Sequence, residues 1–579
     1  MKLSRLLVGL IPILAPVLIL FLIAKNGVNV PFFDEWSIPG QFLVLEKHTF
    51  ADYFAQSNES RLIIPKAIFL AVSKFVGWQP KHYMYFGWLI VLLIFILIYK
   101  ACYRRLTRGR NQDLTGLLCL SLSSALLFSP AAFENWLWGI QWVVFVPLLC
   151  AMIAFHIQDR TQSFTLRFCS SVFLNAVAMF SFANGMLMWI ISFPFWREGT
   201  RWVGGSRASK SGTYRLLVWS LLYLLTAVIF ARIYFIDYQQ LPAHPSLTHA
   251  LKEPWSVLRY FAAWCGGPFH SGVALRITLG MLFICLVLLV FLGIANRVRK
   301  HPGWRTVFFL RMSYPSLLII AYAFASGMIT AIGRVGFGVD QAFSSRYLFH
   351  SGVLLVGIIA AINAHRILTL RQRQSPGDCS GVFRNVIVVS LIFFLRTWHH
   401  YYQEFEARAL AQKQTLLTVR MLAIAPKSPM VNKTCPWTDL SVLARALSDK
   451  NIYRTSSFGD WIADELTHPE LENGGVFKIR KQSQSAISVA GWGMIPTQGT
   501  PAEAVLICRN GGSGHLEPWM MLAVGFKNDV VPEIPSKSLP KKCGFIEYFQ
   551  SDWTVEVPSV EMFSVDERNR KLYPISRIP

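Results

Sequence analysis

Apolar runs of roughly the length that crosses a bilayer recur from the N-terminus to about residue 400. In a bilayer the backbone has to satisfy its own polar groups, so each run is expected to form a helix. The sequence therefore predicts a polytopic α-helical membrane protein with about 11 transmembrane helices. These candidate spans lie at 6–24, 83–99, 114–129, 139–156, 168–182, 186–196, 214–234, 273–296, 314–332, 347–364 and 385–398.

The chain has a formal net charge of +24, which by itself is typical of nucleic-acid binding. The position of the charges argues against that partner, because Lys and Arg gather in every second loop between the apolar runs. This alternation is the positive-inside pattern of membrane proteins. It predicts a bacterial inner-membrane protein with its N-terminus in the cytoplasm and no nucleic-acid partner.

Two parts of different composition are predicted, a transmembrane domain over 1–398 and a soluble domain over 399–579. The first periplasmic loop, 25–82, contains an amphipathic stretch at 62–78 that suits a helix lying on the membrane surface. The tail begins with a helical pattern at 401–422. It continues in short alternating runs, which predict an α+β domain with a small β-sandwich-like part. An odd number of crossings places this tail in the periplasm.

Three cysteines of the tail, Cys435, Cys508 and Cys543, would lie in an oxidising compartment. Two of them could then pair, and the sequence leaves open which two. No pair or cluster of cysteines has the spacing of a zinc or iron–sulfur site.

The strongest local signal is the acidic pair Asp34–Glu35, which stands among aromatic residues shortly after the first span. A carboxylate beside a membrane can be partly desolvated, which adapts it to general-base catalysis. Asp34 could equally anchor a divalent cation, Mg or Mn, on the phosphate of a donor. A solvated loop pair within an interfacial aromatic belt is the alternative explanation.

Two loops, the first one again and the loop after the third span, carry further polar residues suited to a sugar phosphate. In the first loop, Arg61 is expected to clamp a phosphate, or to contact lipid headgroups, and Glu59 to bind a sugar hydroxyl or favour the start of the next helix. The loop after the third span mixes tryptophans with polar groups. Indole rings stack on sugars and amides bind their hydroxyls. The candidate sugar- or acceptor-binding residues of that loop are Glu134, Asn135, Trp138 and Gln141.

Arg334 and Arg346 stand in a loop that the charge bias assigns to the periplasm. Because cations are scarce there, the two arginines favour a specific anionic partner, a lipid phosphate or pyrophosphate. An ion pair with Asp340 or Glu134 is the structural alternative.

The acidic pair after the first span, the amphipathic stretch, the many further spans and the outside tail together resemble the GT-C superfamily of polyprenyl-phosphate-sugar-dependent glycosyltransferases. The resemblance covers most of the membrane part in architecture, and in residues it rests on Asp34–Glu35. It implies an inverting transfer of sugar from a polyprenyl-phosphate donor to a glycan, lipid or protein acceptor. Asp34 or Glu35 would then be the base or cation anchor, and Arg61, Arg334 and Arg346 would hold the donor phosphate.

Two other functions stay open at this point. An O-antigen or polysaccharide polymerase or ligase would also use arginines in periplasmic loops, but it would not need carboxylates directly after the first span. A transporter or flippase of lipid-linked sugars would place ionisable residues within the membrane, and the predicted spans contain few of them.

Overall fold

The computed structural model describes residues 2–104, 114–203, 210–240, 245, 247–300, 303–372, 379–435, 439–453, 458, 461–483, 486–510, 515–525, 542–550 and 560–577. The chain divides into two compact units. The first, here called the helical unit, contains Met1–Gly27, His48–Ile68 and His82–Phe405. The second, here called the tail unit, contains Val28–Lys47, Phe69–Lys81 and Glu406–Pro579. Two segments of the predicted first loop therefore fold with the tail.

Seven helices of the described residues are long and apolar enough to cross a membrane, as expected of a multi-pass membrane protein. They contain α5 (Pro80–Ile98), α7 (Leu114–Leu127), α9 (Val146–Arg160), α13 (Lys210–Tyr234), α16 (Val273–Lys300), α17 (Trp304–Arg334) and α18 (Ser345–Gln372). The predicted number of about 11 is not confirmed. Two shorter apolar helical segments, Pro12–Asn26 within α1 (Lys2–Asn26) and α10 (Phe164–Met179), also stand where spans were predicted.

One predicted span is not a continuous helix. Over 186–196 the structure has a 3-10 turn, η5 (Ala183–Leu187), one turn of helix, α11 (Met188–Ile191), and then an irregular segment before α12 (Trp196–Val203). Pro194 lies in that segment, and a proline can neither donate the helical hydrogen bond nor tolerate the preceding turn of helix.

The remaining helices connect or flank the spans. They are α3 (Phe50–Phe54), α4 (Ile63–Val76), η2 (Tyr99–Tyr103), η3 (Pro130–Ala132), α8 (Phe133–Leu137), η4 (Gly139–Phe145), α14 (Leu247–Lys252), α15 (Pro254–Cys265), η6 (Val335–Phe337), η7 (Val339–Phe343) and α19 (Cys379–Met421). The predicted last span and the predicted first helix of the tail both lie within α19, and they form one unbroken helix.

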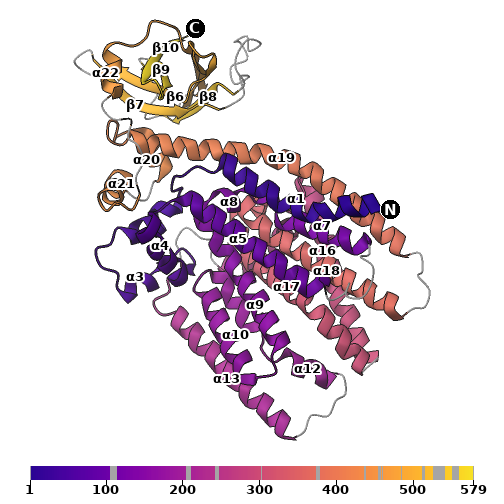
Figure 1. Ribbon diagram of the computed structural model, residues 1–579. Helices are drawn as coiled ribbons and strands as arrows, with labels where there is room; N and C mark the ends of the chain where they lie inside the picture. The colour runs from indigo at the N-terminus through magenta and orange to yellow at the C-terminus, as the bar shows by residue number, and fades with distance from the viewer. Residues whose placement is uncertain are drawn as a thin grey trace. The chain divides into compact units, whose positions relative to one another are not determined.

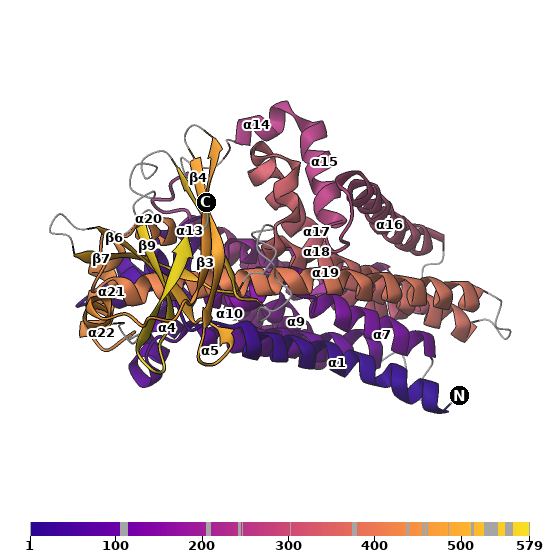
Figure 2. The ribbon, with the colours of Figure 1, turned by 90° about the horizontal axis from the view of Figure 1, so that it is seen from above.

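The helices of the helical unit pack side by side. Helix α7 packs against both α1 and α18, and α17 packs against α18 (Figures 1 and 2). Helix α15 packs against α16 and α17 (Figure 2). Two glycines bring α15 and α16 into backbone contact, since a Cβ at Gly266 would stand 1.9 Å from the Arg276 carbonyl oxygen and one at Gly280 1.7 Å from that of Ala262. This close approach fixes the first turn of α16.

The amphipathic stretch predicted at 62–78 forms helix α4. It is preceded by a two-residue hairpin of β1 (Gln56–Ser57) and β2 (Ser60–Arg61). Asn58 occupies the turn of this hairpin with φ of 50°, a conformation that asparagine tolerates better than most residues. Lys66 of α4 donates to the carbonyl oxygens of Asp52 and Ala55, both at 2.9 Å, and burial lowers its pKa to about 8.

The tail unit is built on one eight-stranded sheet (Figure 1). Its order is β5-β4-β3-β10-β9-β6-β7, and β8 pairs with β4. The strands are β3 (Gly475–Ser483), β4 (Ala486–Ile495), β5 (Thr500–Pro501), β6 (Ala504–Asn510), β7 (Leu516–Ala523), β8 (Gly544–Gln550), β9 (Val560–Asp566) and β10 (Lys571–Arg577). The helical elements are η1 (Trp36–Gly40), α2 (Gln41–Leu43), α20 (Pro429–Thr434), α21 (Leu440–Asp449) and α22 (Trp461–Thr467).

The predicted β-rich domain is therefore present, but it is a half-barrel sheet and not a sandwich. The reason is the last strand. Strand β10 pairs in parallel with β3 and antiparallel with β9, so it joins the two groups of strands into one hydrogen-bonded sheet. Cys508 of β6 is a free thiol in the core, and burial raises its pKa.

A buried ion pair ties α10 to α12 within the helical unit. The Arg167 side chain is 1% exposed, and its two terminal nitrogens donate to the two carboxylate oxygens of Glu198 at 2.8 and 2.9 Å. Removing one partner of a buried pair leaves the other charge uncompensated.

We expect Arg167→Leu to destabilise the protein by about 3–5 kcal/mol. Thermal unfolding in detergent micelles measures this loss, and the double variant Arg167→Leu/Glu198→Leu should recover much of it. An unchanged melting temperature in the single variant would show that the pair does not hold the helices together.

Candidate functional site

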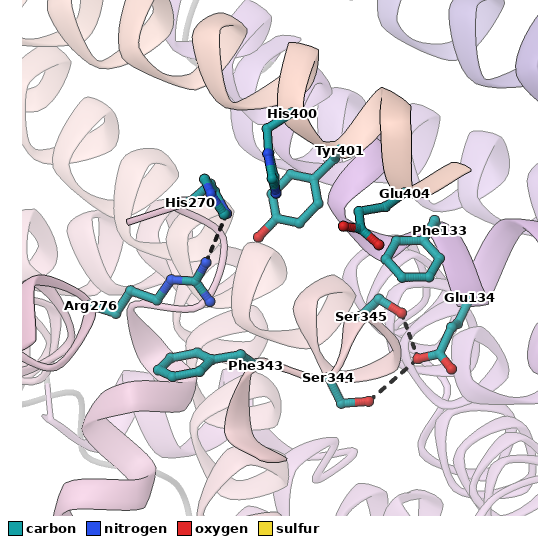
Figure 3. A pocket seen from close by; sticks show the side chains of 10 residues that line it. All are labelled: Phe133, Glu134, His270, Arg276, Phe343, Ser344, Ser345, His400, Tyr401 and Glu404. Atoms are coloured by element: carbon teal, nitrogen blue, oxygen red, sulfur yellow. Dashed lines mark hydrogen bonds between the residues drawn. The ribbon is translucent and has the colours of Figure 1, made fainter. Parts of the chain in front are cut away.

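The helical unit contains a cavity of about 360 Å³ where the ends of several helices meet. It lies between the first turns of α8, α16 and α18 and one face of α19 (Figure 3). It is lined by Phe133, Glu134, His270, Arg276, Phe343, Ser344, Ser345, His400, Tyr401 and Glu404. The histidines and the arginine stand on one side and the two glutamates on the other (Figure 3).

One wall of the cavity is made by Glu134 of α8, whose carboxylate contacts the N-terminus of α18. Its Oε2 accepts from the Ser345 hydroxyl at 2.5 Å, the Ser344 hydroxyl at 3.4 Å and the Arg346 backbone N–H at 3.3 Å. The positive end of the helix dipole favours a carboxylate there. Asn135 reinforces the contact, because its amide nitrogen can donate to the carbonyl oxygens of Ser345 and Arg346 at 3.2 and 3.3 Å.

The opposite wall contains a buried cation, Arg276, which is 7% exposed. Its Nη2 donates to His270 Nδ1 at 3.1 Å, and its guanidinium carbon lies 4.4 Å from the centre of the Phe343 ring. Its Nε is buried without a hydrogen-bond partner, and no carboxylate of the described residues pairs with it. A buried guanidinium without an anion is costly unless a ligand supplies the charge.

Two imidazoles stack beside this cation. The ring centres of His270 and His400 are 3.5 Å apart with an interplanar angle of 20°. Because Arg276 can only donate, the His270 Nδ1 that accepts its hydrogen bond carries no proton. Burial, and then the charges of His400 and Arg276, lower the pKa of His270 below its ordinary value. The imidazole is therefore neutral at pH 7 and can gain a proton when an anion arrives.

The lowered pKa of His270 gives a pH prediction. The unfolded chain binds this proton more readily than the folded protein does. The contribution of His270 to folding stability is therefore fully present above pH 6.5, and it is lost as the pH falls through 6.5 toward the lower pKa of the folded state. His270→Gln should flatten the fall of the melting temperature between about pH 7 and 5. The exposed residue His82 provides the control variant, His82→Gln. Equal acid sensitivity of wild type and His270→Gln would contradict the assignment.

The predicted phosphate-binding arginines have different environments. The guanidinium of Arg61, 2% exposed, donates to the carbonyl oxygens of Tyr234 and Phe54, both at 2.6 Å, and to that of Ile236. It also lies over the Phe54 ring. Through these contacts Arg61 holds the β1–β2 hairpin against the end of α13.

Arg334 forms an ion pair with Glu59, so the structure brings these two predicted residues together. Arg346 has no ion pair within the described part of the chain, and its guanidinium lies 5.5 Å from the centre of the Tyr347 ring. Arg334 and Arg346 both act electrostatically on Tyr260. Of the predicted arginines, Arg346 is therefore the one whose guanidinium has neither a carboxylate nor a carbonyl partner among the described residues.

The other predicted residues of the tryptophan-containing loop after the third span do not line the cavity. Trp138 is 5% exposed and stands between α8 and η4, and Gln141 belongs to η4 and is half-buried. Asn135 is 2% exposed. Glu134 is the residue of this loop that reaches the cavity together with Phe133.

The acidic pair belongs to the tail unit, whereas the arginines and Glu134 belong to the helical unit. The two carboxylates differ in exposure, because Glu35 is 0% exposed and Asp34 is half-buried. Glu35 Oε2 accepts from the Phe32 backbone N–H at 2.8 Å. Phe33, which lies between Phe32 and Glu35 in the chain, has φ of 50°. The loop is thus tightly shaped around Glu35 and leaves Asp34 accessible.

Residues near the start of the tail hold this loop. The rings of Trp36, Trp78 and Tyr453 meet with centre-to-centre distances of 5.9–6.2 Å. The Tyr453 hydroxyl donates to the Asn29 carbonyl oxygen at 3.2 Å. Burial, and then the charge of Glu35, raise the pKa of Tyr453. The geometry of the acidic pair therefore depends on residues more than 400 positions later in the chain.

We expect different roles for the two carboxylates to appear in stability. Glu35→Ala leaves the buried Phe32 N–H unsatisfied and should cost about 1–3 kcal/mol, whereas Asp34→Ala should change stability little. Thermal unfolding of the two variants in the same detergent makes the comparison. Equal destabilisation by both changes would mean that Glu35 does not organise the loop.

Sequence reasoning missed Arg276, His270, His400, Tyr401 and Glu404. The signal was available for Arg276, which stands at the end of a predicted span where cations are otherwise scarce. The histidines come from segments about 130 residues apart, and only packing brings them together.

No group of three or more His, Cys, Asp or Glu side chains that could hold a metal ion occurs within the described ranges. Comparison with protein-family models, with curated proteins and with solved structures found no match. The function is therefore inferred from the chemistry of the cavity and of the loop that holds Asp34 and Glu35, here called the acidic loop.

Proposed function

We propose that this protein is a membrane glycosyltransferase that moves a sugar from a polyprenyl-phosphate donor to a glycan, lipid or protein acceptor. One observation carries the proposal. A cavity in the helical unit has a buried, unneutralised guanidinium on one wall and two carboxylates on the other. A sugar phosphate has the matching halves, an anion and a set of hydroxyl groups.

The cationic wall is suited to the phosphate. An anion beside Arg276 would supply the charge that the protein does not provide, and His270, which stacks on His400, could gain a proton to add to the attraction. In the transfer step, charge builds up on the departing phosphate. Preorganised cations in a water-poor site stabilise such charge by several kcal/mol.

The wall around Glu134 is suited to the sugar. Its carboxylate and the hydroxyls of Ser344 and Ser345 offer acceptors and donors for sugar hydroxyls, next to the rings of Phe133 and Tyr401. Cavities of a few hundred Å³ with a few convergent polar groups commonly bind small molecules. A volume of about 360 Å³ fits a monosaccharide phosphate rather than a long glycan.

The acidic loop completes the proposal in one of two ways. Asp34, the accessible member of the pair, acts either as the base for the acceptor hydroxyl or as the anchor of a divalent cation, Mg or Mn. Arg346 remains a second candidate ligand for the donor phosphate. The protein would work in the bacterial inner membrane with its N-terminus in the cytoplasm and the tail in the periplasm.

Arg276→Gln should lower the transfer rate by about 10²–10³-fold, in line with the loss of one preorganised donor to developing negative charge. Arg276→Lys should retain part of the activity, because it keeps the charge but not the two-pronged geometry. The assay follows release of polyprenyl phosphate from polyprenyl-phosphate-linked sugars by purified protein in proteoliposomes.

The exposed arginine of α15, Arg259, gives the matched control Arg259→Gln, which should transfer at the wild-type rate. Wild-type protein that moves the donor between leaflets without releasing polyprenyl phosphate would be a flippase, and the proposal would fail. Full activity of Arg276→Gln would place the donor phosphate elsewhere.

A further inference from the structure

Helix α19 sends three polar side chains into the cavity: His400, Tyr401 and Glu404 (Figure 3). Residues three and four positions apart share one face of a helix. The spacing of His400, Tyr401 and Glu404 therefore places all three on the face of α19 that closes the cavity. His400 stands on the side of His270 and Arg276, and Glu404 lies on the side of Glu134 (Figure 3).

The two glutamates of the cavity are in different states. Glu134 already accepts three hydrogen bonds on one oxygen. Glu404 is half-buried and makes no hydrogen bond or ion pair with any residue that the structure describes. Both of its oxygens therefore keep their lone pairs for a ligand.

Transfer of a sugar to a hydroxyl needs a group that takes the hydroxyl proton. A carboxylate that already accepts three hydrogen bonds, from two serine hydroxyls and a backbone N–H, is a weaker acceptor of that proton, but its other oxygen can anchor a sugar hydroxyl. A carboxylate without partners in the same cavity suits the base. The two glutamates are assigned different roles because Glu134 accepts hydrogen bonds and Glu404 accepts none from the described residues.

We propose that Glu404 is the general base of the reaction, an inference that rests on the proposed function. The acceptor hydroxyl gives its proton to the Glu404 carboxylate as its oxygen forms a bond to the anomeric carbon. The bond from that carbon to the phosphate oxygen breaks, and its electron pair stays on the phosphate beside Arg276. Attack opposite the leaving group inverts the anomeric configuration, and the proton passes from Glu404 to solvent.

This assignment leaves Asp34 with the second of its two roles, that of a cation anchor or orienting group. The two roles make different demands. A base is needed for turnover but not for donor binding, whereas loss of a sugar anchor such as Glu134 weakens binding of the donor. The split between kcat and KM therefore separates Glu404 from Glu134.

The test uses the full-length protein in proteoliposomes with a polyprenyl-phosphate-linked sugar and its acceptor. Glu404→Gln should lower kcat by about 10²–10⁴-fold, the range for loss of a general base, with the KM for the donor unchanged. Glu134→Gln should instead raise the KM for the donor. Glu46→Gln, the same change at an exposed loop position, should behave as wild type.

Two further measurements separate a base from a merely structural residue. Glu404→Asp should recover part of the lost rate. Added formate should partly restore Glu404→Ala, because a small carboxylate can enter the space left by the side chain. Melting temperatures of all variants should stay close to that of wild type.

The outcomes distinguish the inference from the proposed function. Transfer by Glu404→Gln within about threefold of wild type would overturn the assignment of Glu404 while leaving the glycosyltransferase in place. The assignment would also be overturned if Glu404→Gln loses transfer, Glu404→Asp is equally inactive and formate does not restore Glu404→Ala. Absence of any sugar transfer by wild-type protein would remove the proposed function and this inference together.

Discussion

The charge of Arg276 is the constraint on which the functional account depends. This guanidinium is nearly buried, hydrogen-bonded to a neutral imidazole and packed on an aromatic ring, with no carboxylate of the described residues paired to it. Proteins rarely bury a cation in this way without an anion. The close packing of α15 on α16, which Gly266 and Gly280 permit, holds the arginine in place. A ligand that brings negative charge would remove the cost.

The cavity separates its charges in a manner that suits a sugar phosphate. Arg276 and the stacked histidines face one end, and Glu134 and Glu404 face the other. Glu134 is held by the first turn of α18, while α19 supplies a carboxylate without such support. In this account the fold positions a phosphate-binding group, a sugar-binding group and a base on three different helices, so that helix packing sets the geometry of the reaction.

Tertiary packing also sets the geometry of the acidic loop. Its aromatic residues Trp36 and Trp78 pack with Tyr453, and Lys450 donates to the Val44 carbonyl oxygen at 2.6 Å. The start of the tail is therefore part of the structure that shapes the acidic pair. The tail unit therefore contains the acidic pair as well as the β-sheet.

The sequence was informative where physical rules act locally. Apolar runs predicted the long helices, the amphipathic pattern predicted α4, and alternating runs predicted strands in the tail. The predictions from sequence failed where tertiary packing determines the structure. Pro194 interrupts a predicted span, and β10 turns an expected sandwich into one sheet.

In the cavity, Glu134 was predicted from its aromatic loop. Arg276 and His400 were missed, because their meeting depends on contacts between distant segments. The burial of Glu35 and the three carbonyl contacts of Arg61 were also invisible in the sequence. Residue type and spacing identified groups capable of the chemistry, and the tertiary contacts decided which of them were already occupied.

The most direct test is an experimental structure of the protein in lipid nanodiscs with a polyprenyl phosphate bound. The account predicts density for the phosphate within hydrogen-bonding distance of the Arg276 guanidinium, with the lipid chain leaving the cavity between apolar helices. Phosphate density at another cation, or a cavity that stays empty at saturating lipid, would contradict it.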